Sequence, residues 1–161
     1  MTADPDSLSN LSAALRTIRE MLNMDVVFIS EFVEGTRTFR YVDARSADCP
    51  VRTGDAGPLD ESYCVRVVDG RLPRRINDAN LLPAALEIPA TRELGVRAHL
   101  SVPIRLRNGK VFGTLCCFSL TTSAELRDED EAALQSIADV IAAGIDRRGS
   151  FRAPGWMAAG H

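Results

Sequence analysis

The chain has no apolar run that approaches the roughly 20 residues of a membrane-spanning helix, and it starts with the polar, acidic residues Met-Thr-Ala-Asp-Pro-Asp. We therefore expect neither a bilayer span nor a signal peptide. The four cysteines include no Cys-x-x-Cys pair, the spacing that many metal and redox sites share. We therefore expect the cysteines to be reduced thiols without a bound metal and the protein to be cytoplasmic.

The chain also lacks a cluster of basic residues. Its arginines gather only in pairs such as Arg74-Arg75 and Arg147-Arg148, and the formal net charge is −3. Binding to nucleic acid needs clustered Lys and Arg opposite the phosphates, so we expect no such partner. With 161 residues and no internal repeat, the chain is long enough for one globular domain with its own core.

The clearest positive signal is a hairpin in residues 95–119. Two runs rich in β-branched and aromatic residues flank Asn108-Gly109, and an Asn-Gly pair favours a turn with positive φ at both positions. Residues 25–33 and 38–44 predict two further strands joined by a turn.

A helix is predicted at each end of the domain. The first, over residues 7–23, has apolar side chains spaced alternately three and four apart, which are Leu8, Leu11, Leu15, Ile18 and Leu22. This spacing is typical of a coiled-coil seam in a homodimer, and it fits equally well a helix packed on its own domain. The last helix starts in the acidic run 127–131 and carries an apolar stripe for core packing, which is Leu134, Ile137, Ala138, Ile141 and Ile145.

The segment between the first two strands and the hairpin is irregular. Residues 45–59 predict a loop, and Asp60 or Ser62 starts a short helix that ends near Gly70. A short strand at 74–78 and small helical turns over 79–94 follow. Such a segment is too long for a mere connector.

This order of elements predicts an α+β fold. Its central antiparallel sheet has the terminal helices on one face and loops and short helices over a pocket on the other. We expect a disordered N-terminus over residues 1–6, one domain over 7–148 and a flexible tail over 149–161.

Several motifs resemble those of the GAF domain, the sensory module of bacterial signalling proteins. The motifs are Ser101-Val-Pro-Ile-Arg-Leu for the penultimate strand, Val111-Phe-Gly-Thr-Leu for the last strand, and 128–145 for the closing helix. Ser62-Tyr-Cys, Asp69-Gly-Arg and Asn77-Asp-Ala resemble a subgroup often found beside cyclic-dinucleotide enzymes. The resemblance covers roughly residues 8–147 and implies a GAF/PAS-like fold with a ligand pocket on the face away from the helices. It names no ligand.

Alternation of side chains along a strand gives the hairpin two faces. The aliphatic set, expected against the helices, is Leu100, Val102, Ile104, Leu115 and Cys117. The mixed set, expected to line the pocket, is His99, Ser101, Thr114, Cys116 and Phe118. A wall of apolar groups with a few polar ones is typical of ligand sites.

Residues 45–94, which we call the covering segment, are expected to lie over the pocket. They add four candidate binding residues, which are Cys64, Asp78, Thr91 and Arg92. A thiol near a helix N-terminus is acidified, and a guanidinium can clamp an anion. Structural alternatives stay open: His99, Cys64 and Cys116 also fit a packed core, Ser101 a backbone hydrogen bond, and Arg92 a surface ion pair.

The function predicted is a non-catalytic bacterial sensor that binds a small molecule of unidentified chemistry. It would relay its state through a helical dimer to an output domain or protein. One alternative is a GAF enzyme that reduces methionine sulfoxide through Cys64 and Cys116, although the close cysteine pair of such enzymes is missing.

Three further alternatives come from the resemblance. A bilin sensor is disfavoured because residues 87–94 hold neither Cys nor His and because Phe118 stands where such domains often have a histidine. Haem would depend on His99 alone, and cyclic-nucleotide binding lacks its Asn-Lys-Phe-Asp-Glu signature. The last alternative is a pure dimerisation module with a collapsed pocket.

Overall fold

A computed structural model describes residues 8–120 and 124–151. The N-terminal segment 1–6, expected to be disordered, and residues 152–161 of the expected tail lie outside the described residues. Within them, no helix is both long and apolar enough to cross a membrane.

A six-stranded antiparallel sheet forms the centre of the fold, in the order β3-β2-β1-β6-β5-β4. The strands are β1 (Val26–Val33), β2 (Thr36–Ala44), β3 (Ala56–Pro58), β4 (Arg75–Ile76), β5 (His99–Arg105) and β6 (Val111–Phe118). The first strand and the last lie side by side in the middle of the sheet. The predicted α+β class with an antiparallel sheet is confirmed.

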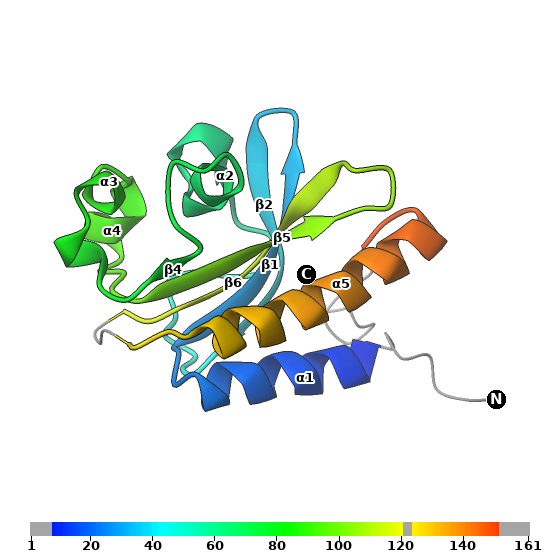
Figure 1. Cartoon of the computed structure of the whole chain (residues 1–161), viewed down its shortest axis with the longest axis horizontal. Coiled ribbons are helices and arrows are strands. Elements are labelled where there is room, and N and C mark those ends of the chain that lie inside the picture. Colours follow the sequence, from blue (N-terminus) through cyan, green and yellow to red (C-terminus); the bar gives the residue numbers. More distant parts are fainter. Residues whose placement is uncertain (1–7, 121–123, 152–161) are drawn as a thin grey trace.

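The helices lie in two groups, one on each face of the sheet (Figure 1). The long helices α1 (Leu8–Met21) and α5 (Asp128–Arg148) run next to each other on one face. The other face is covered by α2 (Tyr63–Val68), α3 (Pro83–Leu86), α4 (Pro89–Glu93) and two single 3₁₀ turns, Leu59–Glu61 and Ala79–Leu81.

The heptad-spaced residues of α1 pack within the domain. Leu11, Leu15 and Ile18 are buried in the core between the long helices and the sheet, and Leu22 packs against it. Packing on the chain's own domain, one of the two interpretations, is therefore confirmed. A coiled coil could not use these three buried side chains, and the homodimer itself stays a prediction; the side chain of Leu8 lies outside the described residues.

The two faces of the hairpin are as predicted. The aliphatic set joins the core under the long helices, and Cys116 and Phe118 belong to a second core on the other side of the sheet. The side-chain period of two is thus maintained along β5 and β6.

The turn of the hairpin differs from the prediction. Gly109 has a φ of 88°, but Asn108 is not among the described residues with positive φ. The amide of Leu106 donates to the Lys110 carbonyl at 2.8 Å, and the amide of Gly109 donates to the Leu106 carbonyl at 2.9 Å. Three residues therefore lie between the paired residues Leu106 and Lys110, and Gly109 is the one with a left-handed backbone. The prediction was a two-residue Asn-Gly turn.

The loop predicted at residues 45–59 contains a short strand, β3. It pairs with the start of β2, where Thr36 lies opposite Pro58 and Thr38 lies opposite Ala56. Ala-Gly-Pro has little intrinsic strand propensity, so its own sequence could not indicate the strand. The open edge of β2 imposes it.

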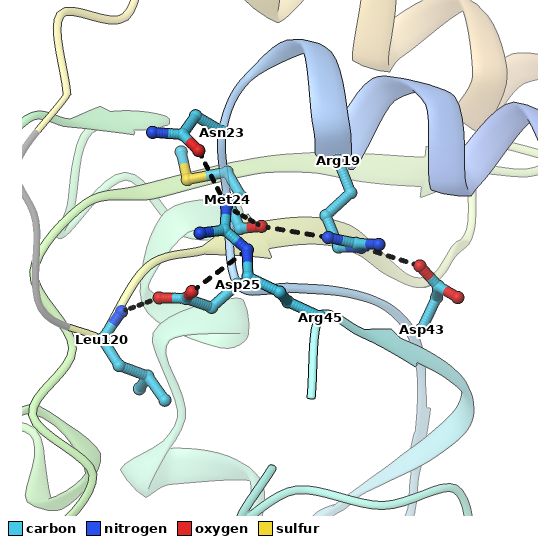
Figure 2. Close-up of polar contacts among 7 residues, drawn as sticks. All are labelled: Arg19, Asn23, Met24, Asp25, Asp43, Arg45 and Leu120. Carbon is cyan, nitrogen blue, oxygen red and sulfur yellow. Dashed lines mark hydrogen bonds and ion pairs between the residues drawn. The ribbon is translucent and has the colours of Figure 1, made fainter. Parts of the chain in front are cut away.

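A buried arginine connects α1 to the sheet (Figure 2). Arg19 donates from Nε to the Asp43 carboxylate of β2 at 2.7 Å and from Nη1 to the Met24 carbonyl at 3.4 Å. The neighbouring Asp25 accepts a hydrogen bond from the backbone N–H of Leu120 at 2.7 Å. This group of contacts links the end of α1, the start of β1, β2 and the exit from β6.

We expect the Arg19→Met variant to lower the free energy of unfolding by about 3 kcal/mol, because it leaves the Asp43 carboxylate, whose side chain is 13% exposed, without its main partner. Arg16 is a matched control, since it lies 3.8 Å from the same carboxylate but is 60% exposed. Arg16→Met should cost less than about 1 kcal/mol. Urea unfolding of both variants measures the difference, and equal losses would contradict this account of the network.

Candidate functional site

A cavity of about 400 Å³ lies between the sheet and its covering segment. Its aromatic walls are Phe28, Phe39, Tyr63, His99 and Phe118. The rest of the lining comes from Arg37 of β2, the loop that leads into β3, β3 itself, the residues at and before the start of α2, and the segment from α4 to β5. The cavity is therefore on the face away from α1 and α5, where the sequence predicted a pocket.

His99 forms a buried part of the wall. It is the first residue of β5, opposite Phe118 of β6, and is only 2% exposed. Its ring stacks on Tyr63 with centroids 4.3 Å apart and planes 22° apart. Burial lowers the pKa of His99 from 6.5 to about 3, so the imidazole is neutral near pH 7.

The imidazole has unused hydrogen-bonding capacity. Within the described residues, His99 Nδ1 is buried and has no hydrogen-bond partner. Buried polar atoms in folded proteins are nearly always bonded to protein or water. His99 is thus a lining residue that carries one polar atom without a partner in the described part of the chain.

Tyr63 is held in position over His99 by its helix and by Thr91. The hydroxyl of Ser62 accepts from the Val65 N–H at 3.2 Å and so caps α2. Thr91 donates to the Ala85 carbonyl at 2.5 Å, so the Tyr63 hydroxyl, which contacts it, is the donor of that pair. Thr91, predicted as a binding residue, supports the cavity wall instead of forming it.

Among the described residues, Arg37 provides the one guanidinium of the lining. Its Cζ lies 3.9 Å from the centroid of the Phe39 ring, a cation–π contact. Its Nε is buried and has no hydrogen-bond partner in the described part of the chain. Because Arg37 belongs to the lining, its guanidinium places a positive charge at the cavity.

A bulge in β2 places Arg37 and Phe39 on the cavity face. Ile29 pairs with Tyr41 and Ser30 with Phe39, so Arg40 has no partner in the register. One extra residue reverses the alternation of side chains. Phe39 accordingly joins the cavity-side core, and Tyr41, two residues later, joins the helix-side core.

The rim of the cavity is acidic. Asp55, Glu61 and Glu93 belong to the lining and are exposed. Set against Arg37, these three carboxylates leave the lining with an excess of negative charge. A ligand with several anionic groups would be repelled there.

A cluster of small polar side chains lies behind the cavity wall, between α2 and the sheet. The Sγ atoms of Cys64 and Cys116 are 3.8 Å apart. Cys116 lies 3.0 Å from Ser101 Oγ and donates to Thr114 Oγ1 at 3.1 Å. Ser30 Oγ donates to Cys64 Sγ at 3.7 Å and lies 2.8 Å from Thr114 Oγ1. All five residues are buried.

The residues proposed from the sequence separate into three groups. Cys64, His99 and Phe118 line the cavity. Ser101, Thr114 and Cys116 form the buried cluster behind it, and Thr91 supports Tyr63. Asp78 and Arg92 lie outside the lining: Asp78 accepts two hydrogen bonds of 2.8 Å from Arg97, and Arg92 is exposed.

The sequence analysis missed several residues of the site, which are Phe28, Ser30, Arg37, Phe39 and Tyr63. Alternation along β1 could have found Phe28 and Ser30, which share the face of Val26. Arg37 and Phe39 could not be found in this way because the bulge at Arg40 is not visible in the sequence. As for metals, the described residues include no group of three His, Cys, Asp or Glu that could hold an ion.

Comparison with known proteins identifies the fold. The model of the GAF domain family matches residues 6–145. No curated protein matches the chain. Among solved structures, GAF3 of Slr1393 from Synechocystis sp. PCC6803 is similar with a TM-score of 0.65 and 16% identity, over 89% of this chain and 96% of that one.

Two other solved structures give the same result. JSC1_58120g3, solved with bound biliverdin, is similar with a TM-score of 0.70 and 15% identity, over 92% of this chain and 93% of that one. The chromophore-binding domain of the bacteriophytochrome RpBphP3 from R. palustris has a TM-score of 0.67 and 15% identity; the alignment covers 89% of this chain and 60% of that one. At such identities the similarity shows the fold alone.

Proposed function

The chain belongs to the GAF domain family, and on this premise we propose that it is a non-catalytic sensory domain whose cavity binds a compact small molecule. The observation that carries the proposal is a cavity of about 400 Å³ whose lining includes the rings of Phe28, Phe39, Tyr63, His99 and Phe118 and the guanidinium of Arg37. Aromatic walls with a few polar groups are typical of small-molecule sites.

The lining favours a particular chemistry of ligand. Its aromatic walls suit a planar, largely apolar body. Arg37 suits one carboxylate or similar anionic group, whereas Asp55, Glu61 and Glu93 disfavour a second one. We therefore expect an aromatic or heteroaromatic molecule with a single acidic group.

The bilins bound by the similar structures do not suit this cavity. Biliverdin is named in JSC1_58120g3 and phycocyanobilin in the GAF domain of a cyanobacterial phytochrome. Bilins and haem alike carry two propionates, and this lining offers one guanidinium beside three carboxylates. The lining thiol, Cys64, is 1% exposed and lies against Ser30 and Cys116. These residues do not fit a tetrapyrrole.

The surroundings of Cys64 favour binding over acyl-transfer catalysis. Within the described residues its hydrogen bonds join it to Ser30, Cys116 and Thr114, none of which is a base. The cavity thus has binding groups without the thiol–base pair that acyl-transfer enzymes use.

The relay to an output is part of the same proposal. Ligand binding can change the output only if the two states of the domain bind the ligand with different affinities. The covering segment contacts the ligand side of the sheet, and α1 and α5 pack on the opposite side. A dimer through α1 and α5 would need their outer surfaces, since Leu11, Leu15 and Ile18 are buried inside the domain.

The test is a thermal-shift screen with monocarboxylates built on benzene, indole or pyridine rings. We expect at least one of them to bind and to stabilise the protein by about 2.7 kcal/mol at 100 times its Kd. Arg37→Gln should weaken that ligand at least about tenfold, because a hydrogen bond to a charged group is worth about 1.5–3 kcal/mol.

Arg40→Gln is the matched control. Arg40 lies on the same strand and pairs with Glu31 at 2.7 Å, outside the cavity lining. It should leave the affinity unchanged. If the ligand bound equally well to the Arg37 and Arg40 variants, the proposed ligand class would be wrong; if no compound in the screen bound, the proposal of a ligand would lose its support.

A further inference from the structure

Two thiols from distant parts of the chain face each other under the cavity. Cys64 lies on α2 and Cys116 on β6, and their Sγ atoms are 3.8 Å apart. Both are free cysteines and both are buried, but Cys64 also forms part of the cavity lining. Cys64 is therefore the member of the pair that lies next to the space that a small reactant would enter.

The surrounding groups favour ionisation of Cys64. Burial raises the pKa of this thiol, but hydrogen bonds from Cys116, Thr114 and Ser30 and the charge of Arg37 outweigh burial and bring the pKa down to about 7. For Cys116, burial and the neighbouring Cys64 raise the pKa. The pair thus resembles an attacking thiol and a resolving thiol, since the thiolate is the reactive form.

We propose that Cys64 and Cys116 form a reversible disulfide when a peroxide enters the cavity, which makes the pair a redox modification site. In the first step the Cys64 thiolate attacks one oxygen of the peroxide, the O–O bond breaks, and Cys64 becomes a sulfenic acid. For hydrogen peroxide the departing hydroxide takes up a proton and leaves as water.

In the second step Cys116 attacks the sulfur of the Cys64 sulfenic acid. The S–S bond forms, the S–O bond breaks, and the hydroxyl group leaves as water with the proton of Cys116. The two thiols lose two electrons and two protons, and the peroxide is reduced to two waters. A dithiol restores the pair by exchange.

The movement required is small. A disulfide has an S–S distance of about 2.05 Å, so the sulfur atoms must approach by less than 2 Å. α2 is only six residues long and lies between the 3₁₀ turn Leu59–Glu61 and the irregular residues 69–74, so a small shift of this one short helix would bring the sulfur atoms together. Because Tyr63 precedes Cys64 and covers His99, the bond would also change the cavity wall.

The other two cysteines are internal controls. Cys117 points to the opposite face of the sheet, in the core under the long helices, and burial raises its pKa to about 12. Cys49 is half-buried, and desolvation raises its pKa. Neither should react at a concentration of peroxide that oxidises Cys64.

The experiment treats the native protein with hydrogen peroxide, quenches it, and alkylates the remaining thiols in denaturant. We expect two of the four thiols to be lost together, with a cross-linked peptide that joins residue 64 to residue 116 and disappears after treatment with dithiothreitol. If both cysteines stayed free while a model thiol peptide was oxidised, or if Cys64 went on to a sulfinic acid without cross-linking, the proposal would be overturned.

Variants separate this proposal from ligand binding. Cys117→Ser should retain the cross-link, while Cys64→Ser and Cys116→Ser should each abolish it. The cross-link between residues 64 and 116 is measured in the wild-type protein. The proposal can therefore still be tested if one of the variants fails to fold. The cross-link does not depend on any carboxylate ligand, so failure of the ligand screen and failure of the cross-link are distinguishable.

Discussion

Gly113→Ala is expected to lower the free energy of unfolding by about 3 kcal/mol or more. A Cβ atom at this position would lie 1.9 Å from the Ser30 carbonyl oxygen and 2.7 Å from its carbonyl carbon. Gly113 pairs with Glu31 of β1 and Ile104 of β5, in the middle of the sheet. The clash is with backbone, which cannot rotate away as a side chain can, so β1 and β6 must separate.

Gly70→Ala is the control for this prediction. Gly70 has a φ of 86° with nothing within 4 Å of an added Cβ, so the substitution costs only the strain of a left-handed residue, about 1–2 kcal/mol. Urea unfolding followed by far-UV circular dichroism compares the two variants. Equal losses would show that the close contact of β1 with β6 does not require glycine.

The protein should lose stability in acid because of His99. Burial lowers its pKa in the folded state from 6.5 to about 3, so between these values the unfolded chain binds a proton that the folded chain does not. This stabilisation is complete above pH 6.5 and is lost as the pH falls toward 3. From pH 7 to pH 4 the loss amounts to about 3 kcal/mol.

His99→Phe isolates this contribution. A phenylalanine ring at this position can stack on Tyr63 as the imidazole does, and the neighbouring cavity gives it space. Unlike the imidazole, it does not titrate. The difference in unfolding free energy between the wild type and His99→Phe, measured in urea at pH 7 and at pH 4, should change by about 3 kcal/mol in favour of the variant. A difference that stays constant with pH would mean that folding does not lower the pKa of His99.

The features that the sequence predicted correctly depend on local patterns. Side chains along a strand alternate between its two faces. This alternation predicted that Leu100, Val102 and Ile104 of β5 face the long helices and that His99 and Ser101 face the other side of the sheet. Asp60 or Ser62 was predicted to start a short helix, and of these two Ser62 caps α2 by accepting from the Val65 N–H. The family resemblance then placed the pocket on the correct face.

The features that the sequence could not predict depend on tertiary pairing. The strand β3 exists because β2 offers it an open edge, and the bulge at Arg40 appears only in the register between β1 and β2. Without that bulge, Arg37 could not be assigned to the cavity. The apolar spacing of α1 fitted two kinds of packing, and only the three-dimensional structure showed that Leu15 is completely buried in its own domain.

Occupancy of the cavity is tested most directly by native mass spectrometry after incubation with a small-molecule extract of cells that express the protein. The account predicts one bound molecule per chain in the wild type and none in Ala90→Trp, since Ala90 lines the cavity and a tryptophan would fill it. Ala133→Trp, an exposed position of α5, should still bind. An adduct that persists in Ala90→Trp, or a wild-type protein that takes up nothing from the extract, would contradict the claim that this cavity is a ligand site.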